Sequence, residues 1–451
     1  MANTYLTRTA GTPTSTQKGT FSAWVKRSSS ADARIFTSWG GGSRQFWLNF
    51  QTDSTDSHMQ IADYDGSYNF RYLTNRKFRD FSAWYHIVFA IDTTLGTAGD
   101  RVKLYINGVQ ETSFSVSTAP SQNQVLNFAT SGDAHIIGKR DAEEYFNGSM
   151  SYVAFIDGTQ ELPTIFGETD STTGEWKIKT TITPSVAWGN NGFFILKNGN
   201  SVTDQSGNSN NFTVGGGTLT KTEDNPDNNF ATLNPLYVVN VSQMPTLTNG
   251  NTTGTSTSTG FNAGVASIAP AGSGKYYSEH KLISGTGGWE TNTYLGYNQT
   301  PSASPTSAPH DTNFFYGVLA DGGAREGATN KAGYAGTWTA GDIIRLALDL
   351  DNNRLYVGKN QYWSDGSGNW DEANINAYIN LAASPAVAGE NWFMMCGDKN
   401  TSTATWGNNF GNGYFGTTAV SSAGTNASGN GIFEYDVPTG YTALSTKGLN
   451  T

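Results

Sequence analysis

Apolar and polar residues alternate with a period of two along most of the chain, which predicts short β-strands. Residues 84–92, WYHIVFAID, place their isoleucines and phenylalanine on one face. Residues 101–110, RVKLYINGVQ, alternate in the same way, and their Asn107-Gly108 pair fits a type I′ turn because both positions tolerate positive φ. The best helical candidate, residues 371–381, is short and rich in asparagine. The predicted fold class is all-β, with two antiparallel β-sandwiches.

The segment GDIIRLALDLDNNRLYVGKN, residues 341–360, places Asp349, Asp351 and Asn353 at alternate positions. An EF-hand loop would need a glycine at its sixth position and a bidentate acid at its twelfth. Those positions hold an arginine and an asparagine here. Leucines and isoleucines alternate on both sides of the Asp-Asn-Asn triplet, so the segment predicts a β-hairpin.

The length and the turn-rich stretches of the chain predict its domain organisation. A chain of 451 residues exceeds what one compact core usually holds. Stretches rich in Asn, Thr, Ser and Gly near the middle contain few large apolar residues, which is typical of connectors and surface loops. We predict a first β-sandwich over 1–165, an irregular connector with one or two strands over 166–229, and a second β-sandwich over 230–451.

Composition and charge exclude several classes of partner. The net charge is −10 and the sequence pI is about 5.0, so nothing attracts the chain to nucleic acid or to an anionic membrane. No apolar run approaches the about 18 residues needed to span a bilayer, and no membrane insertion is expected. The first residues lack the apolar core of a signal peptide, which predicts synthesis and folding in a reducing cytoplasm. The single cysteine, Cys396, has apolar neighbours and is expected in a core.

Four segments of the first third occur in an order that resembles the laminin-G-like, concanavalin-like jelly-roll family. They are GTFSAWVKR (19–27), WYHIVFAID (84–92), RVKLYINGVQ (101–110) and HIIGKR…YFNGSMSYVAFIDG (135–158). The resemblance implies that the first sandwich is a concanavalin-like jelly roll.

Segments of the last half resemble the SPRY-type sandwich. They are GKYYSEHKL (274–282), the predicted hairpin 341–360, TWGNNFGNG (405–413) and VPTGYTALS (437–445). His280 and Lys281 replace an apolar pair common in that family, and the polar insert 298–335 is unusual there. The resemblance implies a SPRY-like second sandwich.

The pairing of these two modules through FGETDSTTGEWKIK (166–179) and DQSGNSNNFTV (204–214) resembles virion proteins of tailed bacteriophages. That resemblance implies a tail-fibre, receptor-binding or head-decoration component. It implies other virion proteins as partners and the virion as the location.

Concanavalin-like folds include glucanases, which need two carboxylates across the scissile bond. The chain contains no Glu-x-Asp-x-Glu strand. The nearest group is Asp141, Glu143 and Glu144 in DAEEYF, for which we favour a solvated turn. His86 alternates with apolar neighbours and is interpreted as a hydrogen-bonded sheet residue, and His310 lies in a polar loop without a visible partner. We expect no enzymatic activity.

No cofactor is expected, and the metal prediction is weak. Asp63 and Asp65 in IADYDGSY are candidate calcium ligands, since some laminin-G-like domains bind calcium at a rim. An Asp-Gly turn between strands explains the same residues, and we prefer it.

Aromatic residues in predicted loops are the candidate glycan-binding groups, because sugars present C–H faces that stack on rings. The candidates are Tyr64, Tyr68, Trp289, Trp363 and Trp370. The last two lie in one Gly-, Asp- and Ser-rich stretch, where turn formation alone does not explain two tryptophans. The alternative for each ring is packing against its own domain.

These observations favour a non-enzymatic phage virion protein, a tail-fibre or receptor-binding component that adheres to host-surface glycan. One alternative is a capsid-decorating or head-fibre subunit that binds only virion proteins, and a less favoured one is a glycan-cleaving enzyme. A homo-oligomer, for example a trimer, is compatible with exposed sandwich edges.

Overall fold

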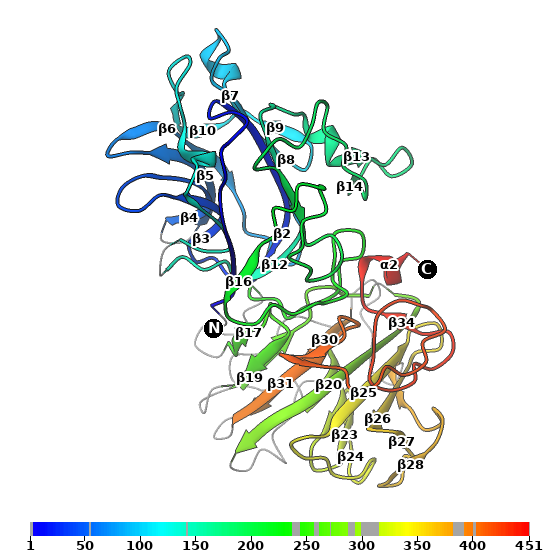
Figure 1. Ribbon diagram of the computed structural model, residues 1–451. Coiled ribbons are helices and arrows are strands. Elements are labelled where there is room, and N and C mark those ends of the chain that lie inside the picture. Colours follow the sequence, from blue (N-terminus) through cyan, green and yellow to red (C-terminus); the bar gives the residue numbers. More distant parts are fainter. Residues whose placement is uncertain are drawn as a thin grey trace. The chain divides into compact units, whose positions relative to one another are not determined.

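The computed structural model divides the chain into two compact units, Met1–Lys221 and Thr222–Thr451 (Figure 1). Both units consist almost entirely of antiparallel strands, which confirms the all-β prediction. None of the helices in the described residues is both long and apolar enough to cross a membrane. The described residues are 3–53, 56–140, 143–236, 244–256, 261–270, 272–286, 294–298, 315–381, 392–399 and 403–450.

The first unit contains two large sheets in its described residues, here called sheet A and sheet B. Sheet A has the spatial order β10 (Phe114–Thr118), β6 (Tyr68–Lys77), β5 (Asp56–Tyr64), β4 (Gln45–Asp53), β3 (Ala33–Trp39), β11 (Ala134–Ile137), β1 (Tyr5–Thr9) and β16 (Thr213–Gly216). Sheet B has the order β15 (Phe193–Ile195), β12 (Gly148–Asp157), β2 (Lys18–Arg27), β7 (Tyr85–Asp92), β8 (Val102–Ile106) and β9 (Val109–Glu111). The remaining elements are the hairpin β13 (Gly167–Thr169) and β14 (Trp176–Ile178), and the 3-10 turns η1 (Ala98–Asp100), η2 (Asn127–Ala129) and η3 (Pro163–Ile165).

Alternation along the strands fills the core between sheets A and B. The isoleucines and phenylalanine of β7 are fully buried in this core, as predicted. Phe21 of β2 stacks on Phe89 of β7 and on Phe36 of β3, with ring centroids 5.5 and 4.9 Å apart. Burial of each such side chain contributes roughly 1.5–3 kcal/mol. Asn107 and Gly108 have φ values of 49° and 78°, which confirms the predicted turn between β8 and β9.

Residues 166–229, predicted as a connector, supply strands to the first unit. β15 pairs with β12 at the edge of sheet B, and β16 pairs with β1 at the edge of sheet A. The two compact units divide between Lys221 and Thr222.

The second unit also contains two large sheets in its described residues, sheet C and sheet D. Sheet C has the order β17 (Thr246–Thr248), β18 (Thr253–Thr255), β31 (Thr403–Asn409), β20 (Lys275–Thr286), β25 (Ile343–Asp349), β26 (Arg354–Lys359), β27 (Tyr362–Ser364) and β28 (Trp370–Glu372), with β29 (Ile379–Asn380) on β26 and β34 (Thr442–Ala443) on β20. Sheet D has the order β19 (Phe261–Val265), β30 (Phe393–Lys399), β21 (Tyr294–Asn298), β22 (Phe315–Leu319), β23 (Ala324–Glu326) and β24 (Thr329–Lys331). A small ladder of β32 (Tyr414–Phe415) and β33 (Thr418–Ala419) and the helix α2 (Thr446–Leu449) follow.

The predicted hairpin of residues 341–360 is β25 and β26. Its alternating leucines and isoleucines lie in the core of the second unit. This confirms the hairpin and the prediction that these side chains point into the core. Asp349 accepts hydrogen bonds from the backbone and side chain of Asn352 and pairs with Lys275 at 2.9 Å. The best helical candidate, residues 371–381, holds part of β28 and all of β29 instead of a helix. Cys396 is buried in the core of this unit, as expected.

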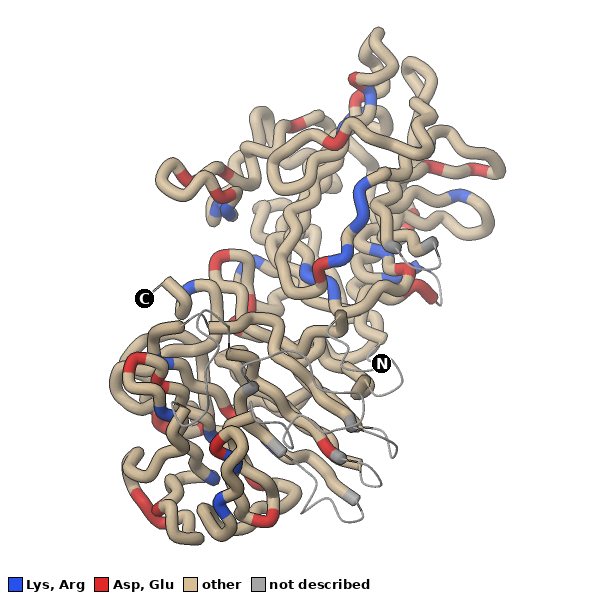
Figure 2. The backbone as a smooth tube through the Cα atoms, turned by 180° about the vertical axis from the view of Figure 1, so that it is seen from behind, with Lys and Arg blue, Asp and Glu red and all other residues tan. Residues whose placement is uncertain are grey.

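Charged side chains are sparse over the described parts of both units, as Figure 2 shows, in keeping with a charged fraction of 14%. Aromatic rings, amides and hydroxyls therefore supply most of the groups from which a binding site can be built.

Candidate functional site

The acidic group considered for catalysis does not have the properties of a general acid. Burial raises the pKa of Glu144, but the charge and hydrogen bond of Arg34, together with Arg140, outweigh this and hold the pKa below its ordinary value. A glycosidase acid needs the opposite shift. Glu143 is exposed, and Asp141 lies outside the described residues.

His86 is hydrogen-bonded on both sides, as predicted for a sheet residue. The indole Nε1–H of Trp176 donates to His86 Nδ1 at 3.0 Å, so the imidazole proton resides on Nε2. That Nε2–H donates to the hydroxyl of Ser22 at 2.8 Å. Burial lowers the pKa of His86 to about 3. Because His86 donates to Ser22, it does not act as a base toward that hydroxyl.

The two calcium candidates lie in different environments. Asp63 is buried, and its carboxylate accepts hydrogen bonds from Asn69 Nδ2 at 2.7 Å and from the backbone and side chain of Asn127 at 2.7 and 2.8 Å. Burial raises the pKa of Asp63 to about 6. Asp65 is exposed in the turn before Gly66, whose φ is 79°. Within the described residues no three His, Cys, Asp or Glu side chains are grouped to hold a metal ion.

Tyr64 and Tyr68 meet at the end of the β5–β6 hairpin. Their rings are edge to face with centroids 5.2 Å apart, and Tyr68 is 45% exposed. The guanidinium carbon of Arg71 lies 5.1 Å from the centre of the Tyr68 ring, and Trp47 of β4 lies 6.1 Å from Tyr68 between ring centroids. Trp47 points away from the core, because Phe46 and Leu48 beside it are core residues. The structure thus groups two predicted residues with an arginine and an indole on the outer face of sheet A.

Amide side chains extend this group along the outer face. Trp47 Nε1 donates to Gln60 Oε1 at 2.7 Å, and Gln60 Nε2 donates to Gln51 Oε1 at 2.6 Å. The buried Oδ1 of Asn49 and the buried Nε of Arg71 have no hydrogen-bond partner among the described residues. Buried polar atoms are usually paired, but neither of these two atoms reaches the surface, so they lie beneath the face and are not open to a ligand. We call this outer face the tyrosine face, with the members Trp47, Asn49, Gln51, Gln60, Tyr64, Tyr68 and Arg71.

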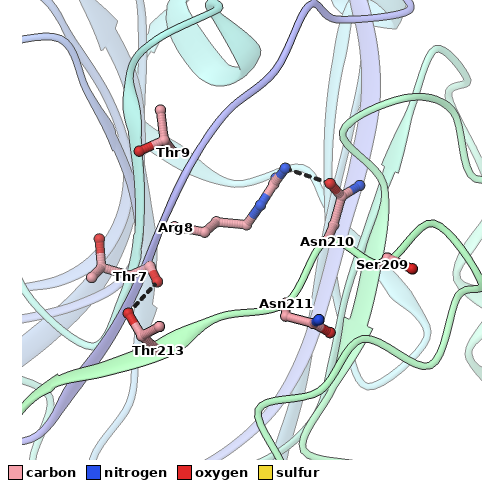
Figure 3. Close-up of a pocket in the computed structure, with 7 residues that line it drawn as sticks. All are labelled: Thr7, Arg8, Thr9, Ser209, Asn210, Asn211 and Thr213. Atoms are coloured by element: carbon pink, nitrogen blue, oxygen red, sulfur yellow. Dashed lines mark hydrogen bonds between the residues drawn. The ribbon is translucent and has the colours of Figure 1, made fainter.

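A small polar pocket of about 420 Å³ lies between β1 and the segment before β16 (Figure 3). Arg8 crosses it, donating to Asn210 Oδ1 at 2.6 Å and to the backbone oxygen of Asn191 at 3.3 Å. Thr213 donates to the backbone oxygen of Thr7 at 3.2 Å. None of the described residues that line the pocket is aromatic. We interpret Arg8 as a brace that holds the edge strand β16 on sheet A.

The tryptophans of the second unit differ from one another. Trp363 is only 4% exposed, and the guanidinium carbon of Arg345 lies 4.1 Å from its ring centre, so its ring offers no free face. Trp370 lies in the wall of an open groove of about 970 Å³. Trp289 lies outside the described residues.

We call this cavity the Trp370 groove. Its lining residues are Gly336, Thr337, Gly341, Lys359, Asn360, Gln361, Tyr362, Gly368, Asn369, Trp370, Asp371 and Tyr435. Tyr362 is 42% exposed and was missed by the sequence prediction, although it stands next to Trp363. The sequence around Tyr362 did not predict its exposure. Alternation along β27 shows that adjacent residues face opposite sides of the sheet, but not which side is exposed.

Comparison with solved structures finds distant likenesses. The SPRY domain of human HERC1 is 17% identical, covers 38% of this chain and 89% of its own, and has a TM-score of 0.26. A putative carbohydrate binding protein from Bacteroides ovatus is 14% identical, covers 49% and 58%, and has a TM-score of 0.32. Domains LG4-5 of the mouse laminin alpha1 chain are 8% identical, cover 89% and 84%, and have a TM-score of 0.27. At these TM-scores the likenesses carry no argument about ligands.

Comparison at the level of sequence is informative for the first third of the chain. No curated protein matches the sequence. Residues 1–165 match the family described as the concanavalin A-like lectin/glucanases superfamily, which confirms the concanavalin-like, laminin-G-like resemblance of this part of the chain.

Proposed function

We propose that the protein is a non-enzymatic virion component of a tailed bacteriophage, of the tail-fibre or receptor-binding type, that adheres to host-surface glycan through the tyrosine face. The observation that carries the glycan-binding part is the tyrosine face itself. It lies within the region that matches the lectin/glucanase family and combines an exposed ring, amides and a guanidinium.

The chemistry of the tyrosine face suits a saccharide. The exposed ring of Tyr68 offers a surface on which the C–H face of a sugar stacks, and Arg71 behind it restricts the ring. Gln51 places a partly exposed amide along the same face, and the partly exposed guanidinium of Arg71 supplies donors for hydroxyl groups. Sheet strands hold all of these groups, so little ordering is needed on binding.

The proposal of a non-enzymatic protein is supported by the two groups that resemble catalytic residues. Glu144 is held ionised by arginines, and His86 is a hydrogen-bond donor toward Ser22. Neither arrangement supports proton transfer to a leaving group.

The placement in a virion rests on the order of the two modules and the segments that join them. In that setting the partners are other virion proteins, and many copies on one particle multiply weak contacts into firm attachment. A trimer formed through sandwich faces is compatible with this arrangement.

A glycan array probed with the full chain tests the glycan-binding part. We expect binding to at least one glycan, and Tyr68→Ala should weaken it about tenfold, the effect of losing one stacking contact. Tyr378→Ala, which removes a 40% exposed tyrosine of the second unit, is the matched control and should bind as wild type.

Three results would each contradict a part of the proposal. A glycan array without any binding would favour the capsid-decorating or head-fibre alternative. Unchanged binding by Tyr68→Ala would show that the tyrosine face is not the glycan-binding site. Gold-labelled antibody against this chain should decorate virions in micrographs, and its absence from particles would refute the virion role.

A further inference from the structure

The Trp370 groove lies at one end of sheet C, where fixed turns form its walls. One wall is the turn between β26 and β27. There Asn360 accepts a hydrogen bond from the backbone of Ile343 and donates to Asp342, both at 2.9 Å. The side chain of Asn360 therefore ties the turn to the start of β25 and holds it in one conformation.

The indole of Trp370 is held in position by contacts of its five-membered ring with Gly336. Its Nε1–H donates to the backbone oxygen of Gly336 at 2.7 Å. A Cβ atom at residue 336 would lie 2.6 Å from Cδ1 of this indole, so only glycine permits the approach. Trp370 also packs partly on the core of its unit. The ring is therefore preorganised while part of it lines the groove.

Aromatic and polar side chains surround this ring. Tyr362 presents a 42% exposed ring, and Tyr435 lines the groove as well. The side chains of Gln361 and Asp371 are exposed and make no hydrogen bond to any described residue. Rings that stack on C–H faces, beside amide and carboxylate groups that bind hydroxyls, are the groups that recognise a saccharide.

The charges of the groove are balanced. Among the described residues, its lining contains one cationic side chain, Lys359, and one anionic side chain, Asp371. Lys359 is already engaged, since its ammonium donates to the backbone oxygen of Thr337 at 3.1 Å and lies 3.8 Å from Asp342. A ligand with a net charge gains little here, so the groove favours an uncharged one.

From these observations we infer that the Trp370 groove is a second saccharide-binding site, which takes a short uncharged oligosaccharide. Its volume of about 970 Å³ is at the upper end of the roughly 300–1,000 Å³ of small-molecule sites, which gives room for more than one sugar ring. The groove belongs to the second unit and does not depend on the tyrosine face. With both sites a single chain is bivalent toward a polysaccharide, which multiplies its affinity without new contacts.

Fluorine NMR of the full chain tests this inference. The protein is prepared with 5-fluorotryptophan in the Tyr68→Ala background, and Trp370→Phe identifies the Trp370 signal among the 12 tryptophans. The probes are oligomers of glucose, galactose, mannose and N-acetylglucosamine, with uronic-acid oligomers as charged counterparts. We expect at least one neutral oligomer to shift the Trp370 signal saturably.

Variants of the groove supply affinities from the same titration. Tyr362→Ala removes a ring outside the core and should weaken binding about tenfold, and Gly336→Ala should do the same by displacing the indole. Tyr378→Ala is the control and should bind as the parent.

Three outcomes would overturn the inference: no neutral oligomer shifts the Trp370 signal at millimolar concentration, only the uronic-acid oligomers do, or Tyr362→Ala titrates like the parent. Because Tyr68 is absent from this background, failure here leaves the proposed function standing, and failure of the tyrosine face leaves the groove standing.

Discussion

In each unit a segment covers the outer face of one sheet and buries an ionisable side chain beneath it. The buried side chain is a base in the first unit and an acid in the second. In the first unit the β13–β14 hairpin covers sheet B and encloses His86. In the second unit the segment that contains Glu434 and Tyr435 covers sheet C and encloses Glu279. Each buried group joins the covering segment to the sheet by hydrogen bonds.

His86 is a neutral group held between two indoles. Its ring lies 4.7 Å from Trp24 and 5.9 Å from Trp176 between centroids, with both pairs stacked. Gly108 and Gly167 make room for Trp176, because a Cβ on either would lie 2.5 or 2.6 Å from its ring. No charge is therefore buried at this site, and no desolvation penalty for one arises there.

Glu279 is a buried acid on β20 of the second unit. It accepts hydrogen bonds from the backbone of Glu434 at 2.7 Å, from the backbone of Tyr435 at 2.9 Å and from the hydroxyl of Tyr277 at 2.9 Å. Burial raises its pKa to about 7 despite these donors. A carboxylate accepts from several donors at once, which an imidazole does not, but its ionised form is disfavoured by burial.

The difference gives the two groups opposite pH dependence. A histidine whose pKa is lower in the folded state than in the unfolded state destabilises the fold once the pH falls below its pKa in the unfolded chain. Below that pH, unfolding takes up a proton. A carboxyl whose folded pKa is raised contributes stability below its unfolded pKa and loses it as pH rises through its folded pKa. The histidine under one closing segment and the glutamate under the other therefore contribute with opposite sign to how each unit responds to acid.

The largest effect is expected for Glu279→Ala. Two part-buried backbone N–H groups and the buried hydroxyl of Tyr277 lose their acceptor, which should lower the free energy of unfolding of the second unit by about 3 kcal/mol. Urea unfolding with pulse-labelling hydrogen exchange, resolved by peptide, measures each unit separately. The first unit should not change, and neither unit should respond to Asp227→Ala, which removes an exposed acid of the second unit. Equal losses in both units would contradict the assignment.

The response to acid between pH 6.5 and 4.5 should differ between the units. In the first unit, unfolding takes up protons at His86 and His135, both with a pKa of about 3, and releases one at Asp63, with a pKa of about 6. The net uptake of about one proton should cost on the order of 1 kcal/mol per pH unit. In the second unit, uptake at His280, with a pKa of about 4, is offset by release at Glu279.

The same urea series at pH 6.5, 5.5 and 4.5 measures this difference. The first unit should lose stability at each step while the second stays nearly constant. Replacing Glu279 by Gln should make the second unit lose stability on acidification as well. A free energy of unfolding that does not change with pH in this variant would contradict the claim that Glu279 offsets His280.

Trp176→Phe should have a smaller effect, about 1 kcal/mol on the first unit. The phenyl ring is smaller than the indole and lacks the donor to Nδ1. The pKa of His86 should rise toward its ordinary value as water reaches Nδ1, which NMR titration of the imidazole measures. His135, which is not bonded to Trp176, is the internal control. An unchanged pKa of His86 in this variant would show that the indole N–H of Trp176 does not help to keep that pKa low.

The smallest effects are expected for the exposed rings. Tyr68→Ala and Tyr362→Ala should each change the free energy of unfolding by no more than about 0.5 kcal/mol, because surface substitutions rarely do more. Loss of binding in these variants then reports on ligand contacts. A destabilisation of 2 kcal/mol or more would instead indicate a packing role.

Local pattern determined much of the fold. Alternation assigned the core faces of β7 and of the β25–β26 hairpin, because side-chain direction in a strand depends only on the neighbouring residues. The Asn107-Gly108 turn was predictable because few residue pairs tolerate two positive φ angles. The order of short motifs predicted a concanavalin-like first module, which the family match over residues 1–165 confirms.

Tertiary structure alone decided which aromatic residues are exposed. Trp363 and Trp370 lie seven positions apart in one polar stretch, yet pairing of Trp363 with Gly358 places its ring against Arg345, while Trp370 extends to Gly336. In the same way Trp176 reaches His86 across 90 positions of sequence. A strand's sequence states which face a side chain occupies, but what covers that face comes from segments that fold over it from far along the chain.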